Sequence, residues 1–184
     1  YDSYCDTLFQ KSGYKDKKEY QNEWKYRHGL SNPMNKNRYC SLYLGVHIAE
    51  NILSNVFENV QRMPINNHGY DFICGKGYRI DVKSSCLQKQ SEASTLAMKF
   101  MIRKNKDCDY FLLIGFDNRK DLNPLHIWLI KADEIIRTRR LNELHALGIP
   151  NTPRSIKLFK KYEMIDKLEN VMGICNELKK TYNM

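Results

Sequence analysis

The sequence contains neither the cysteine pairs nor the histidine spacing that a zinc site requires. None of its six cysteines belongs to a Cys-x-x-Cys pair, and the five histidines show no paired spacing with them. This argues against zinc. The cysteines are expected to stay reduced and to pack as small apolar side chains.

Long apolar runs are also missing. No stretch of about 18 apolar residues occurs, which excludes a membrane-spanning helix and a membrane partner. The polar and aromatic N-terminal residues do not resemble a secretory signal. We therefore expect an intracellular, cytoplasmic protein, associated with the nucleoid if its source is prokaryotic.

Acidic residues are scarce relative to basic ones. The chain of 184 residues has 30 Lys and Arg against 21 Asp and Glu, which gives a formal net charge of +9. Such a surplus favours a polyanionic partner, here double-stranded DNA. The length fits one domain, or one domain with an appendage.

Two short runs predict a β-hairpin. Residues 70–74 (YDFIC) and 78–83 (YRIDVK) are rich in aromatic and β-branched residues, and a Gly-Lys-Gly turn joins them. The hairpin puts Asp71 and Asp81 on adjacent strands. Because side chains alternate along a strand, Asp81 and Lys83 project from one face and Val82 from the other, into a core.

These residues suit a divalent cation. Mg²⁺, or Mn²⁺, prefers oxygen ligands and keeps several waters, so Asp71, Asp81 and the main-chain carbonyl of Val82 are candidate metal ligands. The ammonium of Lys83 could orient an attacking water and stabilise developing negative charge. Upstream, apolar residues recur at helical spacing over 41–61, and Glu50 borders that apolar stripe.

The rest of the chain predicts further strands and helices. We expect strands at 95–102, 110–116 and 125–131, a helix starting at 132–139, a loop around Gly148, Pro150 and Pro153, and an amphipathic helix at 161–180. Within the strand 125–131, His126 is interpreted as a structural histidine. The fully apolar run 110–116 is typical of a central buried strand.

A helical Glu, then Asp in one strand and Asp-x-Lys in the next, resembles the PD-(D/E)xK nuclease superfamily, over residues 41–136. The resemblance implies an α/β fold with a restriction-endonuclease-like core: a mixed central β-sheet flanked by helices, with basic helical N- and C-terminal extensions. It implies that Glu50, Asp71, Asp81 and Lys83 are catalytic and that Glu50 completes or tunes the metal site. Tyr70 departs from the pattern, in which proline precedes the first acid.

The activity that the resemblance implies is a Mg²⁺-dependent DNA endonuclease that leaves 5′-phosphate and 3′-hydroxyl ends. A site-specific homing or restriction-like enzyme is favoured over a Holliday-junction resolvase. A non-catalytic DNA-binding module and an RNA-directed factor remain alternatives, because Asp71 could be a hairpin residue and Asp81–Lys83 a surface ion pair. A homodimer is expected, since a double-strand cut usually needs two active sites.

DNA contacts are predicted on both sides of this core. Candidates are Lys17, Lys18, Trp24, Lys25 and Arg27 in a helix at 15–28, Ser84 and Ser85 after the lysine, and Arg137, Arg139 and Arg140. The helix could instead be docked by Trp24 with solvated lysines, and the serines could simply end a strand. A loop at 31–39 follows, so the predicted parts are 1–40, 41–136 and 137–184.

Overall fold

The computed structural model describes residues 33–64, 67, 69–89, 95–102, 107–118, 121–137, 145–164 and 176, and the side chains of its first helix from Gly45 onward. In chain order the elements are α3 (Pro33–Val56), β1 (Gln61–Arg62), β2 (Phe72–Cys74), β3 (Tyr78–Cys86), β4 (Ala97–Met101), β5 (Tyr110–Phe116), β6 (Pro124–Lys131), α4 (Ala132–Ile136), β7 (Ala146–Pro150), α5 (Pro153–Phe159) and the 3-10 helix η1 (Lys160–Tyr162). The fold is therefore mixed α/β, as predicted.

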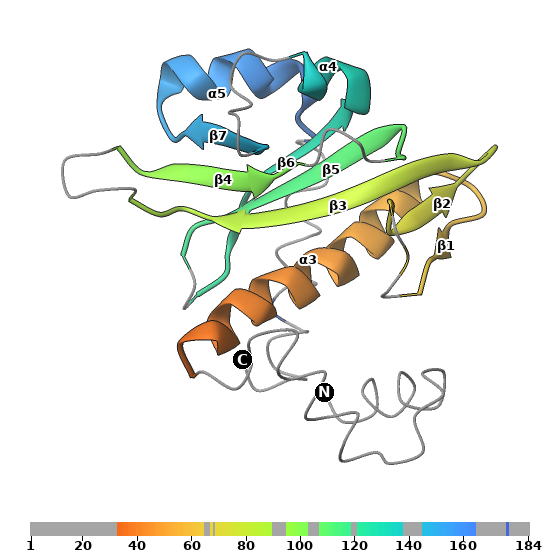
Figure 1. Ribbon diagram of the computed structural model, residues 1–184, viewed down its shortest axis with the longest axis horizontal. Coiled ribbons are helices and arrows are strands. Elements are labelled where there is room, and N and C mark those ends of the chain that lie inside the picture. The colour runs from red at the N-terminus through yellow and green to blue at the C-terminus, as the bar shows by residue number, and fades with distance from the viewer. Residues whose placement is uncertain are drawn as a thin grey trace.

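The central sheet has the strand order β1-β2-β3-β5-β6 (Figure 1). β3 and β5 are parallel, whereas the other neighbours are antiparallel, so the sheet is mixed as predicted. The predicted hairpin is confirmed, with Phe72 opposite Ile80. Gly75 and Gly77 turn the chain with φ angles of 57° and 102°, which glycine adopts at little cost.

One layer covers each face of this sheet (Figure 1). α3 packs on one face through Ile48, Ile52 and Leu53, in a core that includes Ile80 and Val82 of β3. The other face carries a second core, which contains side chains from β4, β7, α4 and α5. β5 is buried on both faces because it is apolar throughout and lies between β3 and β6.

α3 approaches β3 very closely at Gly45. A Cβ atom added to Gly45 would lie 2.9 Å from Cβ of Ser84, so only glycine fits here without a shift. The helix is also longer at its start than predicted, because it begins at Pro33, within the expected loop 31–39. Proline suits the first turn of a helix, where its missing N–H costs no hydrogen bond. The predicted boundary between residues 40 and 41 thus lies inside α3.

The end of α3 and the region after β6 also differ from the predictions. The helix stops at Val56 and not at residue 61, and Asn59 then has a φ of 53°, which a helix cannot accommodate. The loop expected around Gly148 and Pro150 is instead β7, which pairs with β4 in a separate two-stranded sheet. Leu147 and Ile149 are buried there, and Pro150 is tolerated because it ends the strand.

Other predicted elements are confirmed or fall outside the described ranges. The strands 110–116 and 125–131 correspond to β5 and β6, and the helix from 132 corresponds to α4. The predicted helix 15–28 lies outside the described residues, as does nearly all of the helix 161–180, whose first residues belong to η1. Within the part of the chain that is described, no helix is long and apolar enough to cross a membrane.

Candidate active site

Asp81 is a buried carboxylate in the middle of β3. Its side chain is 1% exposed, and its Oδ2 lies 2.6 Å from Nζ of Lys83, two residues along the same strand. The alternation predicted for Asp-x-Lys is confirmed, since Val82 between them packs in the α3 core. A buried carboxylate is costly unless a cation or hydrogen bonds compensate it, and Lys83 supplies the cation.

Asp71 reaches the same strand from the end of the hairpin. Continuing the register of β2 and β3 by one residue sets Asp71 opposite Asp81. The ladder is irregular at this point, because the amide of Asp71 donates to the carbonyl of Ile80. Oδ2 of Asp71 then accepts a hydrogen bond from the amide of Val82, at 2.7 Å. The Asp71 carboxylate therefore takes the place that a main-chain carbonyl of a longer β2 would occupy.

The Val82 peptide group connects the two acids. Its amide binds Asp71, and its carbonyl oxygen lies 3.4 Å from Nζ of Lys83, which also contacts Asp81. N–H and C=O of one residue point to the same side of a strand, so the Val82 carbonyl faces the edge at which Asp71 lies. The ammonium of Lys83 thus contacts two of the four predicted metal ligands, Asp81 and the Val82 carbonyl. A third, Asp71, binds the Val82 amide.

Glu50 lies near this edge but pairs elsewhere. Its Oε2 is 3.4 Å from Arg62 on β1, and the Glu50 side chain is 43% exposed. Arg62 lies opposite Phe72 in the sheet, and the side chain of Phe72 packs in the core beneath α3. The side chain of Arg62 therefore lies on the α3 side of the sheet, where it meets Glu50. Burial, and next the charge of Arg62, lower the pKa of the neighbouring His47, while Glu50 acts in the opposite direction.

The predicted set of three carboxylates is not assembled. Across the described ranges, no three His, Cys, Asp or Glu side chains gather closely enough to hold a metal ion. The donor set that the strands do bring together is smaller: the carboxylates of Asp71 and Asp81 and the carbonyl of Val82. These are hard oxygen donors, and a cation already lies against two of them, so they fit Mg²⁺ or Mn²⁺ with waters and substrate completing the shell.

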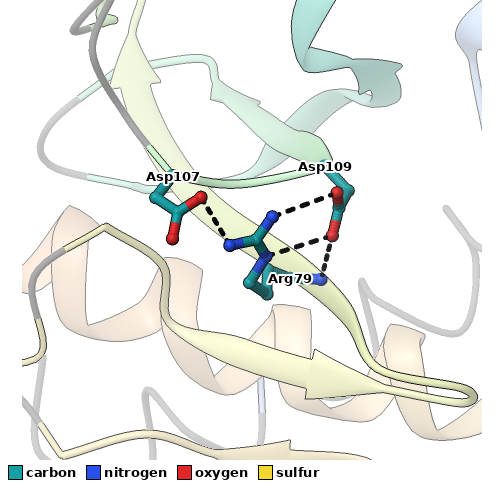
Figure 2. A network of polar contacts seen from close by, with 3 residues as sticks. All are labelled: Arg79, Asp107 and Asp109. Atoms are coloured by element: carbon teal, nitrogen blue, oxygen red, sulfur yellow. Dashed lines mark hydrogen bonds and ion pairs between the residues drawn. The ribbon is translucent and has the colours of Figure 1, made fainter.

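A second charged cluster lies two residues before Asp81 on β3 (Figure 2). The amide and guanidinium of Arg79 hydrogen-bond Asp109, at 2.8 Å for the amide, and the guanidinium also pairs with Asp107. Burial acts to raise the pKa of Asp109, but the hydrogen bonds and charge of Arg79 outweigh it and lower that pKa. Because Arg79 is engaged by these two acids, Lys83 is the cation that compensates Asp81.

The two serines after Lys83 have packing roles. Ser84 lies against Gly45 of α3. Ser85 is buried, and its hydroxyl oxygen accepts a hydrogen bond from the amide of Lys99, which ties β3 to β4. Ser85 is thus covered by β4 and Ser84 lies against α3, and a contact of either serine with DNA stays a prediction.

The remaining predicted DNA contacts are placed only in part. Arg137 is 82% exposed and lies 3.9 Å from Asp133. Lys17, Lys18, Trp24, Lys25, Arg27, Arg139 and Arg140 lie outside the described residues. His126 is a structural histidine as predicted, since its ring stacks on Trp128 with centroids 4.8 Å apart and its Nδ1 is 2.8 Å from Glu163.

Sequence reasoning missed Arg62 and the Arg79 cluster. For Arg79 a signal was present: polar residues at 79, 81, 83 and 85 alternate along one face of β3, the face opposite α3. For Arg62 the sequence contained none, because its partner Glu50 is 12 residues away and on a different element.

Comparisons with known proteins add little. The sequence matches no protein family model and none of the curated proteins with which it was compared. Among solved structures it is similar to a bacterial homing endonuclease, I-Ssp6803I, with 14% sequence identity over 82% of this chain and 98% of that chain, and a TM-score of 0.42.

Proposed function

We propose that this protein is a metal-dependent DNA endonuclease that hydrolyses phosphodiester bonds and leaves 5′-phosphate and 3′-hydroxyl ends. One observation carries the proposal. The ammonium of Lys83 contacts the carboxylate of Asp81 and the carbonyl of Val82, and the carboxylate of Asp71 accepts a hydrogen bond from the amide of the same Val82, where β2 ends and β3 continues. Carboxylate and carbonyl oxygens are donors that suit a divalent metal, and such a metal would polarise a phosphate and activate a water.

Each residue of the set has a distinct role in this proposal. Asp71, Asp81 and the Val82 carbonyl hold Mg²⁺ or Mn²⁺, which supplies Lewis acidity toward the phosphate and toward water. Lys83 orients the attacking water by a hydrogen bond and stabilises the negative charge that develops on the phosphate. Glu50 pairs with Arg62 on the α3 side of the sheet, so the proposal does not require it as a ligand.

Double-stranded DNA is the proposed substrate because the chain carries a net charge of +9. Polyanion binding by such a surface is dominated by phosphate contacts and falls steeply with salt. A homodimer fits the proposal, since each copy of the site can cut one strand. Site-specific cleavage in the manner of homing or restriction enzymes is the favoured form.

One observation favours a second candidate, a non-catalytic DNA-binding module. Glu50 is engaged by Arg62, and among the described residues no third acidic side chain joins Asp71 and Asp81. A core that has lost part of its metal site would bind DNA without cutting it. This second candidate also binds DNA, and it differs from the first only because it does not cleave DNA.

The experiment that tests the proposal is digestion of a panel of nucleic acids: supercoiled plasmid, linear duplex, a four-way junction and structured RNA. Each is incubated with Mg²⁺, Mn²⁺ or EDTA. Nicking of duplex DNA that needs the metal and leaves 5′-phosphate ends supports the proposal. Tight duplex binding with no cutting of any substrate would establish the non-catalytic module, and selective symmetric nicking of the junction would indicate a resolvase-like enzyme.

A further inference from the structure

The helical segment formed by α5 and η1 has two different sides. Ser155 and Phe159 are buried and Ile156 packs against the second core, so this side docks on the protein. Arg154, Lys157 and Lys160 recur at intervals of three residues and are all exposed. Residues three apart lie on the same side of a helix, so these three cations form one continuous row, which we call the basic stripe.

No described carboxylate pairs with the basic stripe. Most other described arginines have one: Arg62 pairs with Glu50, Arg79 with Asp107 and Asp109, and Arg137 with Asp133. The residue that follows the stripe, Lys161, lies 3.8 Å from Glu134 on α4, which is also bound by the hydroxyl of Tyr162. Glu134 of α4 therefore pairs with Lys161 and Tyr162, and not with the stripe.

A row of like charges without counter-charges is unfavourable for the free protein. Like-charged side chains three or four residues apart on a helix repel one another. The stripe contains two such pairs, Arg154 with Lys157 and Lys157 with Lys160. An extended polyanion would remove this repulsion, whereas a single small anion would contact only part of the row.

We propose that the basic stripe of α5 and η1 binds the phosphate backbone of duplex DNA, as an anchoring surface separate from the Asp71–Asp81–Lys83 site. At a rise of about 1.5 Å per residue the stripe is roughly 9 Å long. One strand of B-DNA carries a phosphate about every 3.4 Å along its axis, so the stripe spans two to three phosphates. For the identity of the polyanion the inference rests on the proposed function, but it does not depend on cleavage.

The test compares two triple variants of the full chain that change the net charge equally. The stripe variant combines Arg154→Gln, Lys157→Gln and Lys160→Gln. The control combines Lys76→Gln, Lys89→Gln and Lys131→Gln, three exposed lysines outside α5 and η1. Binding to a duplex fragment is measured in EDTA over a series of salt concentrations. Circular dichroism melting curves check that each variant folds like the parent chain.

The stripe variant should bind duplex DNA at least tenfold more weakly at about 0.1 M salt, with its log–log salt slope shallower by about 2–3, since each phosphate contact contributes about 0.9. The control should change affinity by less than threefold. Equal weakening by both triples would mean that only net charge matters and would overturn the inference. So would an unchanged stripe variant, or one that loses binding to RNA or to anionic vesicles and keeps its binding to duplex DNA.

The result of the cleavage experiment does not depend on the result of this binding experiment. If the parent chain cuts no nucleic acid but the stripe variant still loses duplex binding, the stripe stands and the endonuclease proposal does not. If the parent chain cuts DNA and the stripe variant binds and cuts as well as the control, the reverse holds. A Lys157→Gln single variant, whose slope should be shallower by about 1, supports the triple.

Discussion

Two clusters on the same face of β3 contain the same kinds of charge, and they differ in what those charges can do. Each has two carboxylates and one cation: Asp107 and Asp109 with Arg79, and Asp71 and Asp81 with Lys83. In the first cluster the planar guanidinium contacts both acids, and both acids are exposed, Asp107 by 71% and Asp109 by 37%. The charges of this cluster are therefore compensated by the contacts of the guanidinium and by solvent.

The second cluster is compensated by one point charge. Asp81 is 1% exposed, and its cation is an ammonium with no fixed fork, which also lies 3.4 Å from the Val82 carbonyl. Asp71 accepts a main-chain amide rather than the ammonium. Under the proposed function, a divalent cation would have to displace only the ammonium from these oxygens, whereas at Arg79 it would have to displace several hydrogen bonds. The count of charges is equal, and burial and donor geometry separate a structural cluster from a candidate metal site.

The largest expected effect comes from removing one charge at each cluster without changing shape. Asp81→Asn should lower DNA cutting by at least about 10³-fold, because a metal ligand is lost, while duplex affinity stays within about threefold. Asp109→Asn is the same chemical change at the other cluster and should leave cutting within about twofold. Initial rates of plasmid nicking and duplex binding curves check both.

The comparison breaks if the two variants lose cutting equally, or if Asp81→Asn loses DNA binding along with cutting. Either result would give Asp81 a structural role. A melting curve for each variant shows whether a loss of activity merely reflects unfolding.

Removing the cation of the second cluster should reveal the metal site through stability. Lys83→Gln leaves Asp81 buried without its ammonium and should cost about 2–3 kcal/mol of unfolding free energy, or a melting temperature lower by about 5–10 °C. Millimolar Mg²⁺ should restore part of this loss and should raise the melting temperature of Lys83→Gln more than that of the parent chain. An equal response to Mg²⁺ in both proteins would argue against metal binding at Asp81.

The corresponding change in the first cluster should be milder. Arg79→Gln leaves Asp107 and Asp109 in contact with water, so their charges regain solvation when the guanidinium is gone. We expect a smaller fall in melting temperature than for Lys83→Gln and no change in the response to Mg²⁺ or in cutting. The same melting curves, recorded with and without Mg²⁺, make the test; a Mg²⁺ rescue of Arg79→Gln would remove the distinction between the clusters.

The second cluster could be predicted from the sequence because its geometry is local. Alternation along one strand relates Asp81 to Lys83, and a short turn with two glycines sets Asp71 against Asp81. The partners of Arg79 could not be predicted, since Asp109 is 30 residues away and reaches it only through the parallel pairing of β3 with β5. The pairing of Glu50 with Arg62 depends in the same way on how α3 packs.

The helices and strands can be divided in the same way, into those that the local sequence predicts and those that depend on distant partners. β5 was predictable because an entirely apolar run has to be buried on both faces. β7 was not, because Gly148 and Pro150 are typical of loops, and only pairing with β4 makes this segment a strand. The burial of Ser85 could not be predicted, because nothing in the local sequence shows that β4 covers it.

The smallest expected effect is a pH dependence of stability that comes from Asp109 in the first cluster. Hydrogen bonds and charge from Arg79 hold the pKa of Asp109 below its usual value, although burial acts the other way. A carboxyl group with a lowered pKa in the folded state stabilises the protein above its unfolded pKa of about 3.9, and this contribution disappears as the pH falls through the folded pKa. Asp109→Asn should therefore be less stable than the parent chain near about pH 6, and the gap should close as the pH falls below about 4. Denaturant unfolding at a series of pH values measures the gap, and a gap that widened in acid would show that Arg79 does not stabilise the charged form of Asp109.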